Sequence, residues 1–117
     1  MTPETLWQRY AAIWSQPRGA RMPELVACVA DDVTYCDPNG TIRGRDALSD
    51  YMGGFQANVP EGRFAITSVL SHHGRMLAHW TLTGAGGKAL QSGASFALVT
   101  EDGRLHSVSG FFPLAGS

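Results

Sequence analysis

The sequence predicts one α+β domain in which helices pack on one face of a curved sheet. Two observations predict this class. Helix signals dominate the first half of the chain, whereas from Arg63 onward short β-rich segments alternate with glycine-bearing turns. The length of 117 residues suits a single domain spanning residues 1–117.

The first helix begins after Thr2, which can cap it, with Pro3 at the first helical position. Pro17 ends the helix. Its apolar residues recur at i, i+3, i+4 and i+7 and form one stripe, made of Trp7, Tyr10, Ala11 and Trp14.

Residues 18–21 are expected to form a loop, and a second, shorter helix follows with Pro23 in its first turn. We expect its inward side chains to be Leu25, Val26 and Val29. Asp31 and Asp32 are interpreted as the turn that leaves this helix, because negative charge does not help at a helix C-terminus.

A short strand is predicted over Val33–Asp37, and the turn Asp37-Pro38-Asn39-Gly40 follows it. The third helix is predicted from Arg45 to about Gln56. Its apolar stripe is Ala47, Leu48, Tyr51, Met52 and Phe55.

Four more strands follow and are joined by short turns, which predicts antiparallel neighbours. These strands are approximately Arg63–Ser71, Arg75–Thr83, Lys88–Thr100 and Arg104–Phe112.

Composition narrows the class of function. The net charge of −1, without a basic stripe, argues against nucleic-acid binding. No apolar run approaches the roughly 20 residues of a membrane helix, and the N-terminus lacks signal-peptide features. Cys28 and Cys36 lack CxxC spacing, and the histidines lack metal-site spacing. We therefore expect a reduced, cytoplasmic protein with no metal or other cofactor and no membrane partner.

Several local motifs, in this order, resemble the nuclear transport factor 2-like superfamily, in its SnoaL-like and ketosteroid isomerase-like branch. They are Gln8-Arg9-Tyr10, Ala30-Asp31-Asp32-Val33, Asp37-Pro38-Asn39-Gly40, Ile42-Arg43-Gly44, Trp80, Asp102-Gly103-Arg104-Leu105 and Gly110-Phe111-Phe112. The resemblance covers nearly the whole chain.

The resemblance implies a cone-shaped domain with three N-terminal helices on a curved, mixed, mostly antiparallel sheet. The sheet and helices would enclose an apolar pocket for a small apolar ligand or substrate, and the outer sheet face would form a homodimer. The side chains expected around the pocket are Trp14, Tyr51, Met52, Phe55, Trp80, Val108 and Phe112. The tryptophans could either line this pocket or fill it.

Asp37 is the main catalytic candidate, because the resemblance implies that the aspartate of the Asp-Pro element is a general base. A carboxylate at the mouth of an apolar cavity is partly desolvated, which strengthens it as a base. Strand alternation places Tyr35 on the same face as Asp37. The alternative is that Asp37 only caps the Pro-Asn-Gly turn.

Tyr10 matches the tyrosine that donates a hydrogen bond to the substrate oxyanion in the isomerases. The alternative is a core tyrosine whose hydroxyl is satisfied within the protein. Ketosteroid isomerase adds a protonated aspartic acid as second donor. Ser95 occupies that position here, and no Asp or Glu lies between Glu61 and Glu101. Serine is a weaker acid, so the oxyanion hole departs from the isomerase pattern.

His106 shares strand parity with Val108 and could reach the pocket as an auxiliary acid or base. His79 and Thr81 are expected on the outer sheet face.

Two functions follow from these residues. The first is an acid/base enzyme that forms an enolate from an apolar carbonyl compound, with Asp37 as base, Tyr10 as oxyanion donor and Ser95 as a second donor. Double-bond isomerisation and polyketide-type aldol cyclisation both fit this chemistry. The second is a module of the same fold without catalysis, which binds a hydrophobic ligand or dimerises.

Overall fold

The structure, a computed structural model, describes residues 1–114. Within them are three α-helices, one short 3-10 helix and six strands, which confirms the predicted α+β class. Their order is α1 (Pro3–Ile13), α2 (Arg18–Cys28), β1 (Val29–Asp37), β2 (Gly40–Arg43), α3 (Arg45–Asn58), β3 (Arg63–His72), β4 (Arg75–Thr83), η1 (Ala85–Gly87), β5 (Ala89–Val99) and β6 (Leu105–Phe111).

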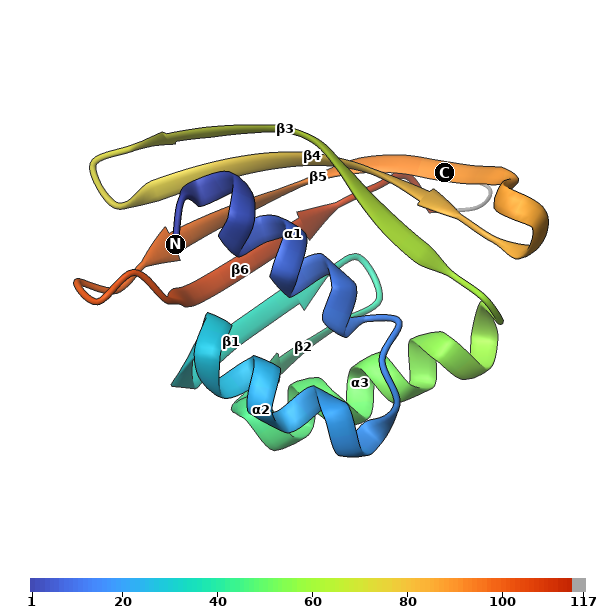
Figure 1. Cartoon of the computed structure of the whole chain (residues 1–117), viewed down its shortest axis with the longest axis horizontal. Helices are drawn as coiled ribbons and strands as arrows, with labels where there is room; N and C mark the ends of the chain where they lie inside the picture. Colours follow the sequence, from blue (N-terminus) through green and yellow to red (C-terminus); the bar gives the residue numbers. More distant parts are fainter. Residues whose placement is uncertain (115–117) are drawn as a thin grey trace.

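All six strands form one mixed sheet in the order β2-β1-β6-β5-β4-β3. Only β1 and β6 run parallel to each other, and the remaining neighbours are antiparallel. Figure 1 shows the sheet bending around the helices, which lie on its concave side. Helix α1 packs on β3 and α2, whereas α3 packs on α2 and β1. The core therefore lies between the concave face and the helices.

Helix α1 forms as its sequence predicts. The Thr2 hydroxyl accepts a hydrogen bond from the Thr5 amide at 3.1 Å, and Pro3 occupies the first turn. The stripe containing Trp7 and Tyr10 is buried against the sheet. The helix ends at Ile13, with Trp14 as its C-terminal cap.

Helix α2 begins at Arg18, so the predicted loop at residues 18–21 is wrong. The buried positions follow the spacing i, i+4 and i+7, namely Arg21, Leu25 and Cys28. Val26 falls off this face and is 47 % exposed, contrary to prediction. The Arg21 guanidinium is satisfied by groups of other segments, because it donates to Ser49 Oγ at 2.9 Å and to the Gln16 carbonyl at 3.0 Å.

Strand β1 starts at Val29, four residues earlier than predicted. Its pairing with β6 shifts register between Val29 and Thr34, and the residues in this irregular stretch include the exposed Asp31 and Asp32. Both aspartates therefore belong to a strand, not to a turn. Strand β2 was not predicted, and it pairs back on β1 directly after the Asp37–Gly40 turn.

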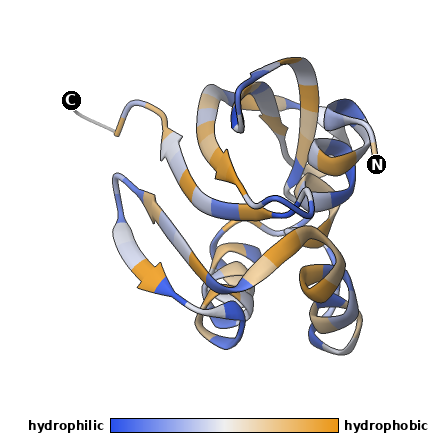
Figure 2. Cartoon of the chain, turned by 90° about the vertical axis from the view of Figure 1, so that its left-hand side faces the viewer, coloured by the Kyte–Doolittle hydropathy of each residue, from blue (hydrophilic) through white to orange (hydrophobic). Residues whose placement is uncertain are grey.

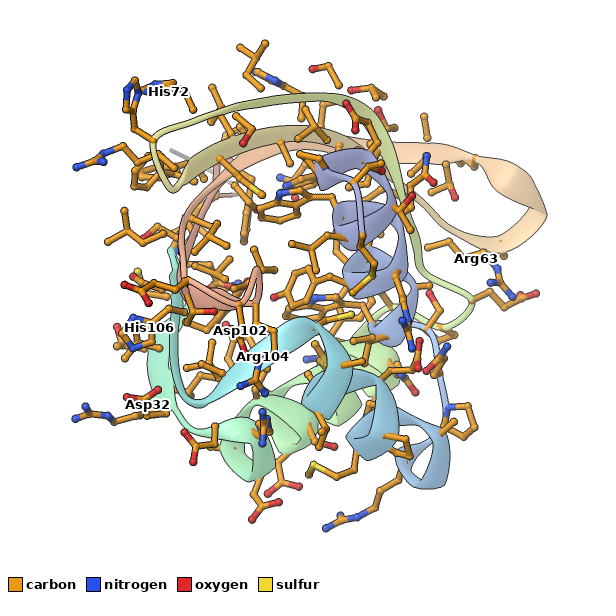
Figure 3. The ribbon with its side chains drawn as sticks, turned by 60° about the vertical axis from the view of Figure 1, so that its left-hand side comes forward. Asp32, Arg63, His72, Asp102, Arg104 and His106 are labelled. Carbon is orange, nitrogen blue, oxygen red and sulfur yellow. The ribbon has the colours of Figure 1, made fainter. Side chains whose placement is uncertain are left out.

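A second irregularity changes the side-chain parity of β6. Leu98 of β5 faces Ser107, but Val99 faces Leu105, which leaves His106 as an extra residue. Leu105 and Val108 are both buried, whereas His106 is exposed. Its Nε2 lies 3.4 Å from Asp32 Oδ1 on the outside of the molecule (Figure 3). The expectation that His106 reaches the pocket is therefore wrong.

Hydrophobic and hydrophilic residues alternate along the strands and around the helices (Figure 2). On β4 the alternation buries Ala78, Trp80 and Leu82. His79 between them is exposed, as expected. Within residues 1–114 no helix is long and apolar enough to cross a membrane.

Candidate functional site

A cavity of about 840 Å³ lies between the concave sheet face and the helices. Most of the side chains predicted around a pocket line it, and they are Tyr10, Trp14, Asp37, Tyr51, Phe55, Trp80, Ser95 and Phe112. Met52 and Val108 belong instead to the closed core, where both are fully buried. Trp14 and Trp80 both line the cavity.

Asp37 is the last residue of β1 and faces this cavity. Its Oδ1 accepts hydrogen bonds from the Tyr51 hydroxyl at 2.7 Å and from the Asn39 amide at 2.8 Å. Its Oδ2 accepts one from the Tyr35 hydroxyl at 2.7 Å. The sequence offered two interpretations of Asp37, a cavity carboxylate and a turn cap. Its position matches both, since Asp37 caps its turn and lines the cavity. A carboxylate has about four lone-pair sites, so Oδ2 keeps one free.

Tyr35 is a site residue that the sequence did not single out. Alternation along β1 puts it on the same face as Asp37, and this was the available signal. Burial raises the pKa of the Tyr35 phenol far above its ordinary range. Burial also raises the pKa of Tyr51, and the hydrogen bond to Asp37 adds to that increase. Both phenols therefore stay protonated and act as donors.

Tyr10 is only 4 % exposed and contributes to the cavity wall. Its hydroxyl has no hydrogen-bond partner within the described chain. Burial raises the pKa of this phenol well above its ordinary range, so the group remains a donor. An unpaired buried hydroxyl is costly, so the Tyr10 phenol is the buried polar group that most needs an explanation at this site.

Ser95 lies on β5, and its Oγ accepts a hydrogen bond from Trp80 Nε1 at 3.1 Å. Because the indole fills one acceptor site of the hydroxyl, the serine proton is free to point to another acceptor. The Trp80 ring lies over Gly93, where an added Cβ would come within 2.4 Å of the ring. Glycine at position 93 therefore allows the indole to reach Ser95.

The base candidate and the serine donor are separated by one glycine. Cys36 pairs with Ser109, and Ser95 pairs with Gly110, so Asp37, Gly110 and Ser95 form a row across three strands. Two strand spacings separate Asp37 from Ser95, roughly 10 Å between Cα atoms. A Cβ on Gly110 would lie 3.4 Å from the Asp37 Cβ and 3.5 Å from the Tyr35 hydroxyl. Gly110 thus keeps the space between the two polar groups open.

Comparison with known protein families identifies the domain. The SnoaL-like domain family matches residues 7–108. The chain belongs to the SnoaL-like family. This membership confirms the resemblance seen in the sequence motifs.

Solved structures share the fold of this SnoaL-like domain. One is a provisionally named isomerase of the SnoaL-like family from Agrobacterium tumefaciens, with 22 % identity, a TM-score of 0.88, and coverage of 97 % of this chain and 100 % of that one. Another is a provisionally named ketosteroid isomerase from Kribbella flavida, with 23 % identity, a TM-score of 0.71, and coverage of 98 % and 80 %.

A provisionally named SnoaL-like polyketide cyclase from Jannaschia has 11 % identity, a TM-score of 0.76, and coverage of 98 % and 90 %. These likenesses concern the fold. The comparison with curated proteins found no match.

The charged groups of this SnoaL-like cavity are all acidic. Asp37 and Asp50 line it, and within residues 1–114 no Lys, Arg or His side chain does. In the same residues no group of three or more His, Cys, Asp or Glu side chains is placed to hold a metal ion. The polar groups in the wall therefore include two carboxylates, three phenols, a serine hydroxyl and the side-chain amides of Asn39, Asn58 and Gln91.

Proposed function

We propose that this SnoaL-like domain is an acid/base enzyme that forms an enolate from a small apolar carbonyl compound. Asp37 is the general base, Tyr10 is the oxyanion donor, and Ser95 is a second donor. The observation that carries the proposal is that the Tyr10 hydroxyl is buried without a partner in the wall of the cavity that Asp37 also lines.

The mechanism begins at Asp37 Oδ2, which accepts only one hydrogen bond, from the Tyr35 hydroxyl. This oxygen takes the proton from the carbon next to the substrate carbonyl, so the C–H bond breaks and its electron pair moves through the carbon–carbon bond to oxygen. The resulting oxyanion accepts hydrogen bonds from Tyr10 and Ser95. Removal of one such donor in other enzymes typically costs about 10²–10³ in rate.

The enolate can then react in two ways. In an isomerisation, the protonated Asp37 returns the proton to a different carbon and the double bond shifts. In an aldol cyclisation, the enolate carbon attacks a second carbonyl and the new alkoxide is protonated by Asp37. The isomerase and cyclase names of two structural neighbours agree with both outcomes.

The alternative is a module that binds a hydrophobic ligand without chemistry. The three donors on Asp37 favour this alternative, because they fill three of the about four acceptor sites of the carboxylate and hold it in place as a wall group. The two functions differ in whether Asp37 removes a proton from carbon.

Kemp elimination of 5-nitrobenzisoxazole tests the enzyme directly. In this reaction the base takes the ring proton, the N–O bond breaks, and a phenolate oxygen is released. We expect a saturable rate that Asp37→Asn abolishes and that Tyr10→Phe lowers by about tenfold or more. Asp50→Asn is the matched control, because Asp50 also lines the cavity but its side chain is 64 % exposed and faces Arg18.

A rate no higher than that of buffer in every protein would contradict the acid/base proposal, as would a rate that survives Asp37→Asn. A rate lost equally in Asp37→Asn and Asp50→Asn would also contradict the assignment of Asp37, because a single base cannot account for both losses.

A further inference from the structure

We propose that this cavity binds organic cations, namely protonated amines carried on an aromatic or alicyclic body, and that it rejects carboxylates. The inference concerns binding and holds whether or not Asp37 also acts as a base. It names a ligand class that the proposed function leaves open.

The first argument is charge. The Asp37 carboxylate accepts only uncharged donors, two phenols and one backbone amide, and among residues 1–114 no ion pair involves it. Asp50 also lines the cavity, but its side chain is 64 % exposed and its Oδ1 lies 3.5 Å from Arg18 Nη1, so its charge contributes little inside. No described lining residue carries a positive charge. A cationic group is therefore attracted to Asp37, whereas an anionic group meets a like charge.

The second argument is the aromatic wall. Nine of the eleven aromatic residues of the chain line the cavity, which includes all three tryptophans and all three tyrosines. They are Trp7, Tyr10, Trp14, Tyr35, Tyr51, Phe55, Phe64, Trp80 and Phe112. Aromatic faces attract cations, and dry sites strengthen that attraction.

The carboxylate and the aromatic rings are parts of one cluster. The two tyrosines that hold Asp37 are also packed on Trp14, with ring centroids 5.4 Å away for Tyr35 and 6.1 Å away for Tyr51. Phe55 and Phe64 contact the same indole at 5.6 and 5.7 Å. An ammonium group that donates to the free site of Asp37 Oδ2 is thus next to rings that also favour it.

Two other polar groups of the cavity residues suit the remainder of such a ligand. The Tyr10 hydroxyl is buried without a partner, and the Ser95 hydroxyl is free to donate. Both could bind a neutral acceptor, such as a ketone or ether oxygen. The ligand class is therefore an amine with an apolar ring body, with or without a neutral oxygen acceptor.

Three ligands with one naphthalene body test the proposal by titration calorimetry near pH 7. They are 2-(1-naphthyl)ethylamine, 2-(1-naphthyl)ethanol and 1-naphthylacetate, which are cationic, neutral and anionic. We expect the amine to bind at least about tenfold more tightly than the alcohol, because its positive charge is attracted to the Asp37 carboxylate and the neutral alcohol lacks that attraction. We expect the carboxylate to bind more weakly than the alcohol.

Two variants test whether Asp37 causes the preference for the amine. In Asp37→Asn the advantage of the amine over the alcohol should disappear while the alcohol still binds, which also shows that the cavity is intact. In Asp50→Asn the order of the three ligands should remain unchanged. Equal binding of amine and alcohol, binding of the carboxylate as tight as that of the amine, or an amine advantage that survives Asp37→Asn would each overturn the proposal.

Failure of all three ligands to bind at about millimolar concentration would overturn it as well. The Kemp rate of the same proteins separates this inference from the proposed function. Amine binding without a Kemp rate would contradict only the enzyme proposal. A Kemp rate without a preference for the amine over the alcohol would contradict only the cation proposal.

Discussion

The three tyrosines of this chain, Tyr10, Tyr35 and Tyr51, should fail to ionise in the folded protein when the pH is raised from about 8 to about 11. All of them line the cavity. Burial raises the pKa of each phenol above its ordinary value near 10. In the unfolded chain the same tyrosines lose their protons in the ordinary range.

The size of the effect follows from linkage. At about pH 11 an ordinary tyrosine is about nine-tenths ionised, so the unfolded chain carries nearly three tyrosinates. Because the folded-state pKa is raised, the stabilisation is complete below about pH 10 and is lost as the pH rises further. Each fully buried tyrosine then costs about 1.4 kcal/mol of unfolding free energy by about pH 11, and Tyr10 with Tyr35 about 3 kcal/mol. Tyr51 is only half-buried and adds less.

The assay is the ultraviolet difference absorbance of tyrosinate, recorded with circular dichroism to establish that the protein is still folded. The folded protein should show almost no tyrosinate at about pH 11, whereas the protein in denaturant should show nearly three per chain. Urea titrations at both pH values measure the loss of stability. Tyr35→Phe should reduce that loss by about 1.4 kcal/mol.

Tyrosinate that forms with a midpoint near pH 10 in a protein that circular dichroism shows to be folded would refute this reasoning, because the phenols would then be solvated. Burial also raises the pKa of the Cys28 thiol to about 11. That shift adds to the alkaline loss of stability but contributes nothing to the tyrosinate band.

Two further predictions concern packing and assembly. Gly93→Ala should lower the free energy of unfolding by about 1–3 kcal/mol, because its Cβ would overlap Trp80. Gly54→Ala has open space around the new methyl group and should raise the free energy of unfolding by about 0.5–1 kcal/mol. Urea unfolding measures both, and a Gly93→Ala variant as stable as the parent protein would contradict the overlap. We also propose a homodimer through the outer sheet face, where Phe96 is 39 % and Phe111 62 % exposed. Light scattering should show a dimer that Phe96→Asp converts to a monomer, and a monomeric parent protein at micromolar concentration would contradict the proposal.

Elements whose signals are local were predictable from the sequence. Thr2 and Pro3 start α1, and their cap forms as expected. The glycine-bearing turns separate β3, β4, β5 and β6, and the parity of Trp80 correctly gives the inward face of β4. Asp37 was identified through the family resemblance, and its turn and its strand position are also readable in a few residues.

Features that depend on contacts with residues elsewhere in the chain were not predictable from local sequence signals. Helix α2 includes a buried Arg21 in its first turns, and the hydroxyl that accepts from this guanidinium belongs to Ser49 on α3. The outward position of His106 depends on a register shift against β5 that alternation along β6 alone does not reveal. The role of Tyr35 lies between these cases, because alternation placed it beside Asp37 but only the fold shows its hydrogen bond.

The hydrogen bonds around Asp37 affect the two proposals differently. Donors from Tyr35, Tyr51 and the Asn39 amide hold the carboxylate in place and leave one acceptor site free on Oδ2. A bound cation needs only that site, whereas an enzyme also needs a donor for the oxyanion. In the enzyme proposal the unpartnered Tyr10 hydroxyl supplies that donor. The enzyme proposal consequently requires Tyr10→Phe to reduce the Kemp rate, whereas binding of an amine at Asp37 does not depend on that hydroxyl.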